Sequence, residues 1–251
     1  MKKVEQIDNV EHACSQRRLL LTSSLGVAAM GAIGLLGYAM PEIVYAAALT
    51  KEERDKMTPD EIIEGLKQGN DRFRSNKPLR HDYLAQKRAS AAGQYPAAAI
   101  LSCIDSRAPA EIILDTGIGE TYNTRVAGNI CNVDILGGLE YACAATGAKV
   151  ILVLGHTSCG AVKGAIDDVK LGNLTELLDK IKPAIAATTY LGERVAANAA
   201  FVDEVAKTNV KMTLDQIRVS SQVLADLEKN GKLKMVGALY NLKSGLVEFL
   251  V

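Results

Sequence analysis

The sequence contains no tryptophan, only three phenylalanines and only three histidines. A core without tryptophan has to be mainly aliphatic, and the hydrophobic residues, 48% of the 251, are sufficient for one. Neither charge is in excess, because 29 basic residues balance 29 acidic ones, so the charge gives no indication of a nucleic acid or an acidic membrane as partner. Beyond residue 48 only His81 and His156 remain, which excludes a zinc site made of three histidines.

The N-terminal segment has the layout of an export signal. Arg17–Arg18 precede a long apolar run, and a stretch of small residues follows it. The paired arginines resemble the twin-arginine type, with leucine where phenylalanine is usual. We expect cleavage after Ala46 or Ala48 and a location in the periplasm of a Gram-negative bacterium. The run, at roughly 20 residues, is also long enough to stay as a membrane anchor. Residues 1–48 are therefore separated from a single domain over residues 49–251.

The five cysteines have different surroundings. Cys14 lies in the signal, which leaves four thiols and the alternative of two disulfides in an exported protein. A chain of this length does not need disulfides to be stable, and Cys103 and Cys159 lie among polar residues that a disulfide does not require. Cys131 in a predicted loop and Cys143 in a predicted apolar helix are interpreted as buried thiols.

The order of predicted elements indicates an α/β domain. Apolar runs typical of buried strands end at Cys103, Val126 and Leu154, and predicted helices separate them, which favours a mainly parallel central sheet flanked by helices. The domain is expected to begin with an N-terminal helical arm. Thr58 caps the main helix of this arm, Gly69–Asn70 interrupt its apolar stripe, and an external loop over 77–87 follows. The later predicted elements are a helix capped by Asp134, helices over 173–188, 195–207 and 213–230, and a C-terminal strand pair over 233–242 and 246–251.

Two strand ends carry residues that bind metals. Cys103 follows the first predicted core strand, and His156 and Cys159 follow another. Parallel neighbouring strands would bring these loops to one edge of the sheet, where open α/β sheets have their sites. Two thiolates and one imidazole are typical zinc ligands, and three protein ligands leave one position for water, as in a catalytic site. We expect one Zn²⁺ ion per subunit.

Asp105 and Arg107 lie next to the first of these ligands. Two thiolates cancel the charge of the zinc ion, so its water needs additional help to ionise near neutral pH. We expect Arg107 to form a two-pronged hydrogen bond that keeps Asp105 ionised. Asp105 would then orient zinc-bound hydroxide as the nucleophile. In a closed, inactive state at low pH, Asp105 itself would be the fourth zinc ligand.

These residues resemble the β-class carbonic anhydrases over nearly the whole domain. The shared motifs are C-x-D-S-R at 103–107, H-T-x-C-G at 156–160, R-x-A-G-N at 125–129, L-E-Y-A at 139–142, G-x-x-Y-x-L-x-x-G-x-V at 237–247 and L-x-x-G-N-x-R-F at 66–73. The resemblance implies a Rossmann-like fold and the zinc-dependent reversible hydration of carbon dioxide to bicarbonate and a proton.

The resemblance also implies further features of the site. The ligands would be Cys103, His156 and Cys159, the catalytic pair Asp105 and Arg107, and the assembly a homodimer or homotetramer with its sites at subunit interfaces. Tyr122 and Gly160 would belong to the substrate pocket. Some relatives have an inhibitory bicarbonate pocket with a tryptophan three residues before the first cysteine. Here Ile100 stands there, although Arg125 and Tyr141 are present, so inhibition by that route is not expected.

Other readings of these residues stay open. The cysteines and His156 could hold a purely structural zinc ion, or His156 and Cys159 could form a nucleophile pair. A protein of this fold could also bind zinc or bicarbonate without catalysis, or hydrolyse carbonyl sulfide or carbon disulfide. The Asp105–Arg107 pair could be architectural. His81 is expected at the surface, with a role in proton transfer as the alternative.

Overall fold

The structure is a computed structural model that describes residues 44–45 and 47–250. The predicted export signal up to residue 43 and the predicted cleavage point at Ala46 lie outside the described residues. Within those two ranges, no helix is both long enough and apolar enough to cross a bilayer.

A five-stranded sheet forms the centre of the domain, in the order β4-β3-β5-β6-β7. The strands are β3 (Ala98–Ser102), β4 (Thr121–Arg125), β5 (Val150–His156), β6 (Lys234–Tyr240) and β7 (Val247–Phe249). All neighbours are parallel except β6 and β7, which pair antiparallel. The predicted parallel sheet and C-terminal strand pair are therefore confirmed. In β3 and β5 every residue is buried, because helices cover both faces of a parallel sheet.

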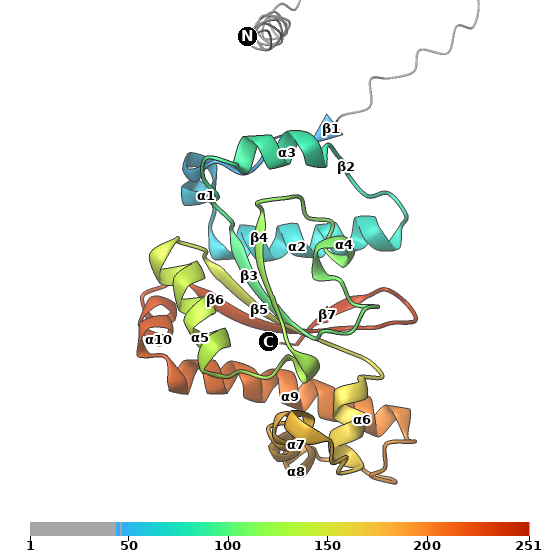
Figure 1. Cartoon of the computed structure of the whole chain (residues 1–251). Helices are drawn as coiled ribbons and strands as arrows, with labels where there is room; N and C mark the ends of the chain where they lie inside the picture. The colour runs from blue at the N-terminus through green and yellow to red at the C-terminus, as the bar shows by residue number, and fades with distance from the viewer. Residues whose placement is uncertain (1–43, 46, 251) are drawn as a thin grey trace, which may run out of the picture. The chain divides into compact units, whose positions relative to one another are not determined.

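Alternate residues of the strands pack into two different clusters. In β3, Ala98 and Ile100 face one cluster, whereas Ala99 and Leu101 face the other. The first cluster packs against α2 (Pro59–Arg74) and α4 (Ala110–Ile113). The second packs against α5 (Val133–Glu140), α9 (Ala199–Ser220) and α10 (Gln222–Lys229). Figure 1 shows α2 and α4 on one side of the sheet and α9 and α10 on the other.

Helix α2 begins at the predicted cap. The Thr58 side chain accepts from the Glu61 backbone and the Glu61 carboxylate accepts from the Thr58 N–H, which is a capping box. The helix continues through the interruption of its apolar stripe, because Gly69 and Asn70 are themselves buried. A Cβ at Gly69 would lie 1.9 Å from the Leu114 carbonyl oxygen, so only glycine permits this close approach.

The rest of the N-terminal arm consists of four short elements: β1 (Val44–Tyr45), α1 (Lys51–Lys56), β2 (Arg80–His81) and α3 (Tyr83–Ser90). Strands β1 and β2 pair parallel. The fully buried Gln86 side chain donates to the Tyr45 carbonyl at 3.0 Å and accepts from the Ile118 N–H. The predicted surface position of His81 is wrong: its side chain is 3% exposed, with Nε2 3.5 Å from Asp115 Oδ1.

Several predicted helix boundaries are also wrong. Asn132, not Asp134, caps α5, because the Asn132 side chain accepts from the Ile135 N–H at 2.9 Å. The helices predicted over 195–207 and 213–230 are in fact α9 and α10, with the break at Ser221. Thr213, the predicted start of the last of these helices, is buried inside α9, where its hydroxyl donates to the Asn129 carbonyl.

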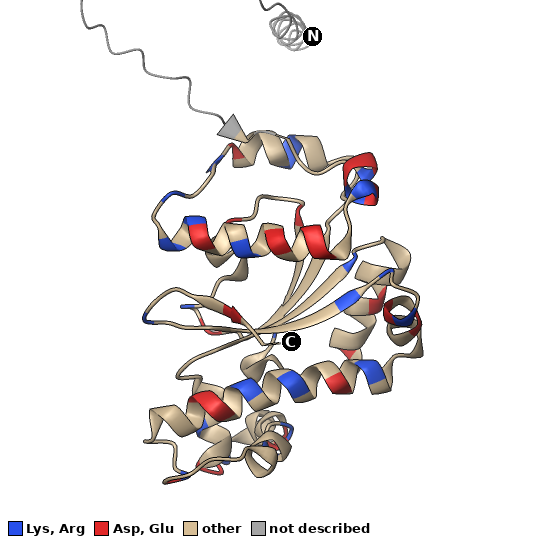
Figure 2. Ribbon diagram, turned by 180° about the vertical axis from the view of Figure 1, so that it is seen from behind, with Lys and Arg blue, Asp and Glu red and all other residues tan. Residues whose placement is uncertain are grey.

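The remaining helical segments lie between the strands along the chain. A 3-10 helix (Ala127–Asn129) follows β4, a π-helical segment (Tyr141–Ala145) continues α5 and leads into β5, and α6 (Gly160–Ile166), α7 (Gly172–Asp179) and α8 (Lys182–Ala187) follow β5. Figure 2 shows acidic and basic residues interspersed along α2 and α9, in agreement with the balanced composition.

Candidate metal centre

The ends of β3 and β5 bring the predicted ligands together. Ser102, the last residue of β3, pairs in register with Leu154 of β5. Cys103 follows β3 directly, His156 is the last residue of β5, and Cys159 stands at the cap position of α6. The parallel register therefore places both loops at the carboxyl edge of the sheet, as predicted.

The three side chains form one buried cluster. The Sγ atoms of Cys103 and Cys159 and a ring nitrogen of His156 all lie within 4.8 Å of one another. His156 Nδ1 is 2.9 Å from the Thr157 carbonyl oxygen, so the proton is assigned to Nδ1, which donates to it. Nε2 of His156 is buried and has no hydrogen-bond partner among the residues that the structure describes. A buried nitrogen lone pair beside two sulfurs is the donor set that zinc prefers, so these residues fit that ion.

The two sulfurs differ in their protonation. The pKa of Cys103 is lowered, mainly by its hydrogen bond with the Cys159 thiol and further by His156 and the Gly128 N–H. The same contact with Cys103, together with burial, raises the pKa of Cys159. Burial opposes protonation of His156, but its interactions with the Cys103 sulfur outweigh burial and raise its pKa. The Cys159 thiol is therefore protonated at neutral pH, and a metal ion that binds both sulfurs must displace that proton.

Asp105 and Arg107 form the two-pronged pair that the sequence predicted. Arg107 Nε donates to Asp105 Oδ1 at 2.9 Å, and Nη2 donates to Oδ2 at 2.7 Å. The Arg107 backbone N–H also donates to Oδ1. These bonds hold the pKa of Asp105 well below its usual range, and the side-chain bonds of Arg107 contribute most to this shift. Asp105 Oδ2 lies 3.7 Å from His156 Nε2, so an ionised carboxylate lies next to the ligand cluster.

Two residues of the R-x-A-G-N motif hold the first ligand loop in place. The Gly128 N–H donates to Cys103 Sγ at 3.3 Å. Arg125 Nε donates to the Cys103 carbonyl at 2.9 Å, and Arg125 Nη2 donates to the Asp105 carbonyl at 2.6 Å. The sequence relates Arg125 to the R-x-A-G-N motif and to an inhibitory pocket, but it predicts neither of these contacts to the Cys103 loop. The Gly-Asn pair at 128–129 was the available signal for Gly128.

The structure brings only one of the two predicted pocket residues next to the ligands of its own chain. Gly160 follows Cys159 as the first residue of α6. Tyr122 lies on β4 opposite Ala99, three residues before the strand reaches Arg125, and its ring packs edge-on against Tyr141 at 6.1 Å. The Tyr122 hydroxyl is buried, and no described residue forms a hydrogen bond with it.

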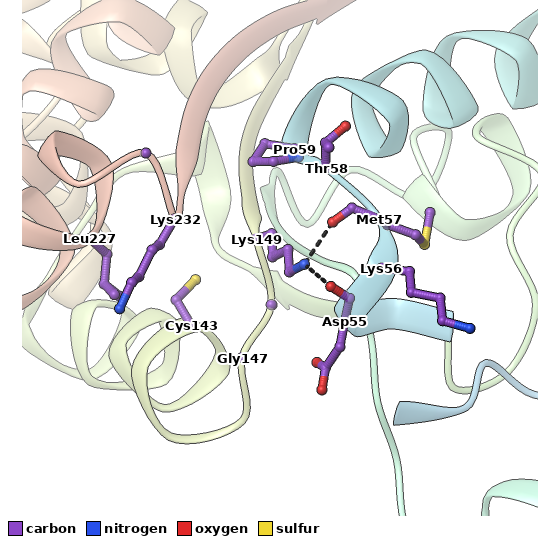
Figure 3. A pocket seen from close by; sticks show the side chains of 12 residues that line it. Asp55, Lys56, Met57, Thr58, Pro59, Cys143, Gly147, Lys149, Leu227 and Lys232 are labelled. Atoms are coloured by element: carbon purple, nitrogen blue, oxygen red, sulfur yellow. Dashed lines mark hydrogen bonds between the residues drawn. The ribbon is translucent and has the colours of Figure 1, made fainter. Parts of the chain in front are cut away.

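The other two described cysteines lie outside the cluster. All four described cysteines are free thiols. Burial raises the pKa of Cys131 and raises that of Cys143 to about 12. Cys143 faces a separate cavity of about 460 Å³ at the amino end of β5, where Lys149 donates to the carbonyl oxygens of Asp55 and Met57 (Figure 3). The predicted interpretation of Cys143 as a buried thiol outside the metal site is confirmed.

Comparisons with known proteins agree with this geometry. The carbonic anhydrase family profile matches residues 98–247. Carbonic anhydrase 2 of Mycobacterium tuberculosis is 35% identical over 186 residues, which cover 72% of this chain and 87% of that protein. A crystal structure of a β-carbonic anhydrase of Aspergillus fumigatus is similar with a TM-score of 0.59 at 23% identity, over 76% of this chain and 89% of the other. A tetrameric β-carbonic anhydrase of Sordaria macrospora is similar with a TM-score of 0.56 at 24% identity, over 64% of this chain and 83% of the other.

Proposed function

Because this chain belongs to the β-class carbonic anhydrase family, we propose that it binds one zinc ion and catalyses the reversible hydration of carbon dioxide to bicarbonate and a proton. Cys103, His156 and Cys159 would hold the ion. The observation that carries this proposal is the buried cluster of two sulfurs and a histidine nitrogen with no other hydrogen-bond partner.

The roles of the residues around the cluster follow from their contacts. A zinc ion held here would acidify water and so supply hydroxide near neutral pH. Asp105 would accept a hydrogen bond from the attacking oxygen and hold it toward carbon dioxide. Arg107 keeps Asp105 ionised and, by occupying both carboxylate oxygens, restrains it from moving onto the metal. In a closed state at low pH, Asp105 would leave Arg107 and become the fourth ligand.

The substrate pocket would be completed by a second copy of the chain. Tyr122 lies too far along β4 to line the pocket of its own chain, so we place it, together with Tyr141, in the pocket of a neighbouring subunit. Exposed apolar residues support such an interface, because Ile104, directly after Cys103, is 60% exposed and Val133, at the start of α5, is 80% exposed. We propose a homodimer or a homotetramer, the latter being the state of the similar Sordaria protein.

The proposed location is the periplasm, after export by a twin-arginine signal over residues 1–48. Twin-arginine export carries folded proteins, so zinc would bind before the thiols reach an oxidising compartment. Cell fractionation tests the location. Mass spectrometry of the exported protein should find no Cys103–Cys159 disulfide, and finding one would contradict loading before export.

Two other functions remain candidates at this site. The same cluster could support hydrolysis of carbonyl sulfide or carbon disulfide, which differ from carbon dioxide in size and in the shape of pocket that they need. A protein with this donor set could also bind zinc or bicarbonate without turnover. The pair Asp105–Arg107 favours catalysis over a structural ion, because a structural site has no use for an ionised carboxylate beside it.

Stopped-flow hydration with a pH indicator, combined with zinc analysis, tests the proposal. The wild-type chain should contain one zinc ion and accelerate hydration above the buffer rate. Cys159→Ala should lose both zinc and activity, whereas Cys143→Ala, which removes a buried thiol outside the cluster, should keep both. Stoichiometric zinc without hydration would overturn the carbonic anhydrase activity. Sulfide release from carbonyl sulfide would then support the hydrolase.

A further inference from the structure

The turn between His156 and Cys159 has a strained backbone. Ser158, the residue directly before Cys159, has φ of +54°, in the left-handed region that side chains other than glycine disfavour. Such a conformation persists only where the surroundings hold it in place. The position of the Cys159 sulfur relative to the His156 ring depends on this conformation, because only two residues separate the two ligands.

The turn is fixed on one side by the end of β6. The Thr157 N–H donates to the Tyr240 carbonyl at 2.9 Å, and the Leu242 N–H donates to the Thr157 hydroxyl at 3.0 Å. These bonds hold Thr157, but they do not reach the strained residue that follows it.

The other side of the turn is held by a carboxylate from α9. Asp203 Oδ1 accepts the Ser158 backbone N–H at 2.7 Å, across 45 residues of sequence. Val202 and Val205, on the same turn of the helix, are fully buried in the cluster that also contains Cys103 and Cys159. The helix backbone at Asp203 is therefore a fixed support, and the carboxylate projects from it onto the turn.

The position of Asp203 is not explained by an ion pair. Within the described part of the chain, no basic side chain pairs with it, whereas the adjacent Glu204 pairs with Lys207 at 3.2 Å. The Asp203 carboxylate instead accepts a hydrogen bond from the Ser158 backbone N–H, in the turn that carries two predicted metal ligands.

We propose that Asp203 is a positioning residue for the metal site, which holds Ser158 in its left-handed conformation and so sets the spacing between His156 and Cys159. This inference depends on the zinc site proposed above. Removing a residue that orients a metal ligand typically lowers the metal affinity of a site 10- to 100-fold. The acceptor oxygen of Asp203 matters for this role, and its negative charge does not.

Zinc affinity, measured by competition with a chromophoric chelator, tests this in four variants. Asp203→Ala should raise the zinc dissociation constant about 10- to 100-fold, since it removes the acceptor. Asp203→Asn keeps an acceptor oxygen and should stay close to wild type. Glu204→Ala, the matched control, removes a carboxylate from the same helix without touching the turn and should have no effect.

The fourth variant combines Asp203→Ala with Ser158→Gly. Glycine adopts positive φ without strain, so the turn needs less support and most of the lost affinity should return. Cobalt substitution gives a second readout, because the ligand-field bands should shift in Asp203→Ala and return toward wild type in the double variant.

The outcomes separate the two proposals. A wild-type chain that binds no zinc overturns the proposed function and this inference together. A wild-type chain with zinc and hydration activity, but an Asp203→Ala variant with unchanged affinity, overturns only the role of Asp203. Equal losses in Asp203→Ala and Asp203→Asn also overturn it, because the charge would then be the cause. Loss in Asp203→Ala without recovery in the double variant means that Asp203 acts other than through Ser158.

Discussion

Replacing Gly128 by alanine should destabilise the domain at the loop that supports Cys103. Gly128 has φ of +70°, and its N–H donates to the Cys103 sulfur at 3.3 Å. A Cβ built on Gly128 would lie 2.5 Å from Cδ1 of Ile181, which is fully buried. The substitution therefore combines backbone strain with overpacking.

The size of the effect follows from these two terms. An alanine at positive φ costs about 1–2 kcal/mol. Forcing one extra methyl group into a packed core costs about 1–3 kcal/mol, because the Ile181 side chain has to leave its rotamer. The free energy of unfolding should fall by about 2–5 kcal/mol, from the sum of the two. At about 2–4 °C per kcal/mol for a domain of this size, Tm should fall by about 4–20 °C.

Thermal unfolding followed by circular dichroism, with zinc affinity measured in parallel, provides the assay. Gly65→Ala is the matched control: Gly65 lies inside α2 with no atom within 4 Å of a built Cβ, so alanine should stabilise the domain by about 0.5–1 kcal/mol. Ile181→Val removes the clashing Cδ1. Alone it should cost about 0.5–1.5 kcal/mol, but combined with Gly128→Ala it should cost less than the sum of the two.

The reasoning is refuted if Gly128→Ala melts within 2 °C of wild type, a margin of about 1 kcal/mol or less. Additive losses in the double variant would show that Ile181 is not the obstacle. Lower stability with unchanged zinc affinity would show that the Gly128 N–H does not tune the Cys103 sulfur.

Three further predictions concern the site and the arm. Asp105→Asn should lower kcat by about 10²- to 10⁴-fold with one zinc ion still bound, as stopped-flow rates and metal analysis would show; unchanged kcat would contradict its role. Because the pKa of Cys159 is raised, its thiol stays protonated at neutral pH and must lose its proton when zinc binds. The zinc dissociation constant, measured by chelator competition at constant ionic strength, should therefore fall at least about tenfold per unit rise in pH near 7. A dissociation constant that does not change with pH would contradict the assigned protonation. Thr58→Ala removes a cap and should lower the free energy of unfolding by about 1 kcal/mol in urea titrations, with Ser75→Ala at the far end of α2 for comparison.

The sequence was sufficient to predict the strand ends and the cluster between them. Apolar runs that stop abruptly at polar residues mark the carboxyl edge of a parallel sheet, and Cys103 and His156 stand at two such points. The pairing of Asp105 with Arg107 could also be predicted, because the partners are two residues apart and opposite in charge.

Contacts between distant segments could not be read from the sequence. Asp203 is one acidic residue among several on an amphipathic helix, and nothing local marks its contact with Ser158. Thr213 with Gln216 matches a capping box, yet burial of Thr213 against the Asn129 loop lets α9 continue through it. His81 lies in a polar stretch, and its side chain is buried by contacts with distant segments, since its ring packs against Tyr45 and its Nε2 lies 3.5 Å from Asp115.

The contact of Gln86 with Tyr45 has a consequence for maturation. The Tyr45 carbonyl accepts from the Gln86 amide at 3.0 Å and from the Asp82 N–H at 3.1 Å. A peptidase that cut after Ala46 or Ala48 would remove this acceptor and leave a fully buried amide short of one bond, at a cost of about 1–3 kcal/mol if water does not replace it. Cleavage at either position would therefore remove β1 and its pairing with β2, whereas an uncleaved chain would keep both, and N-terminal sequencing of the purified protein distinguishes the two forms.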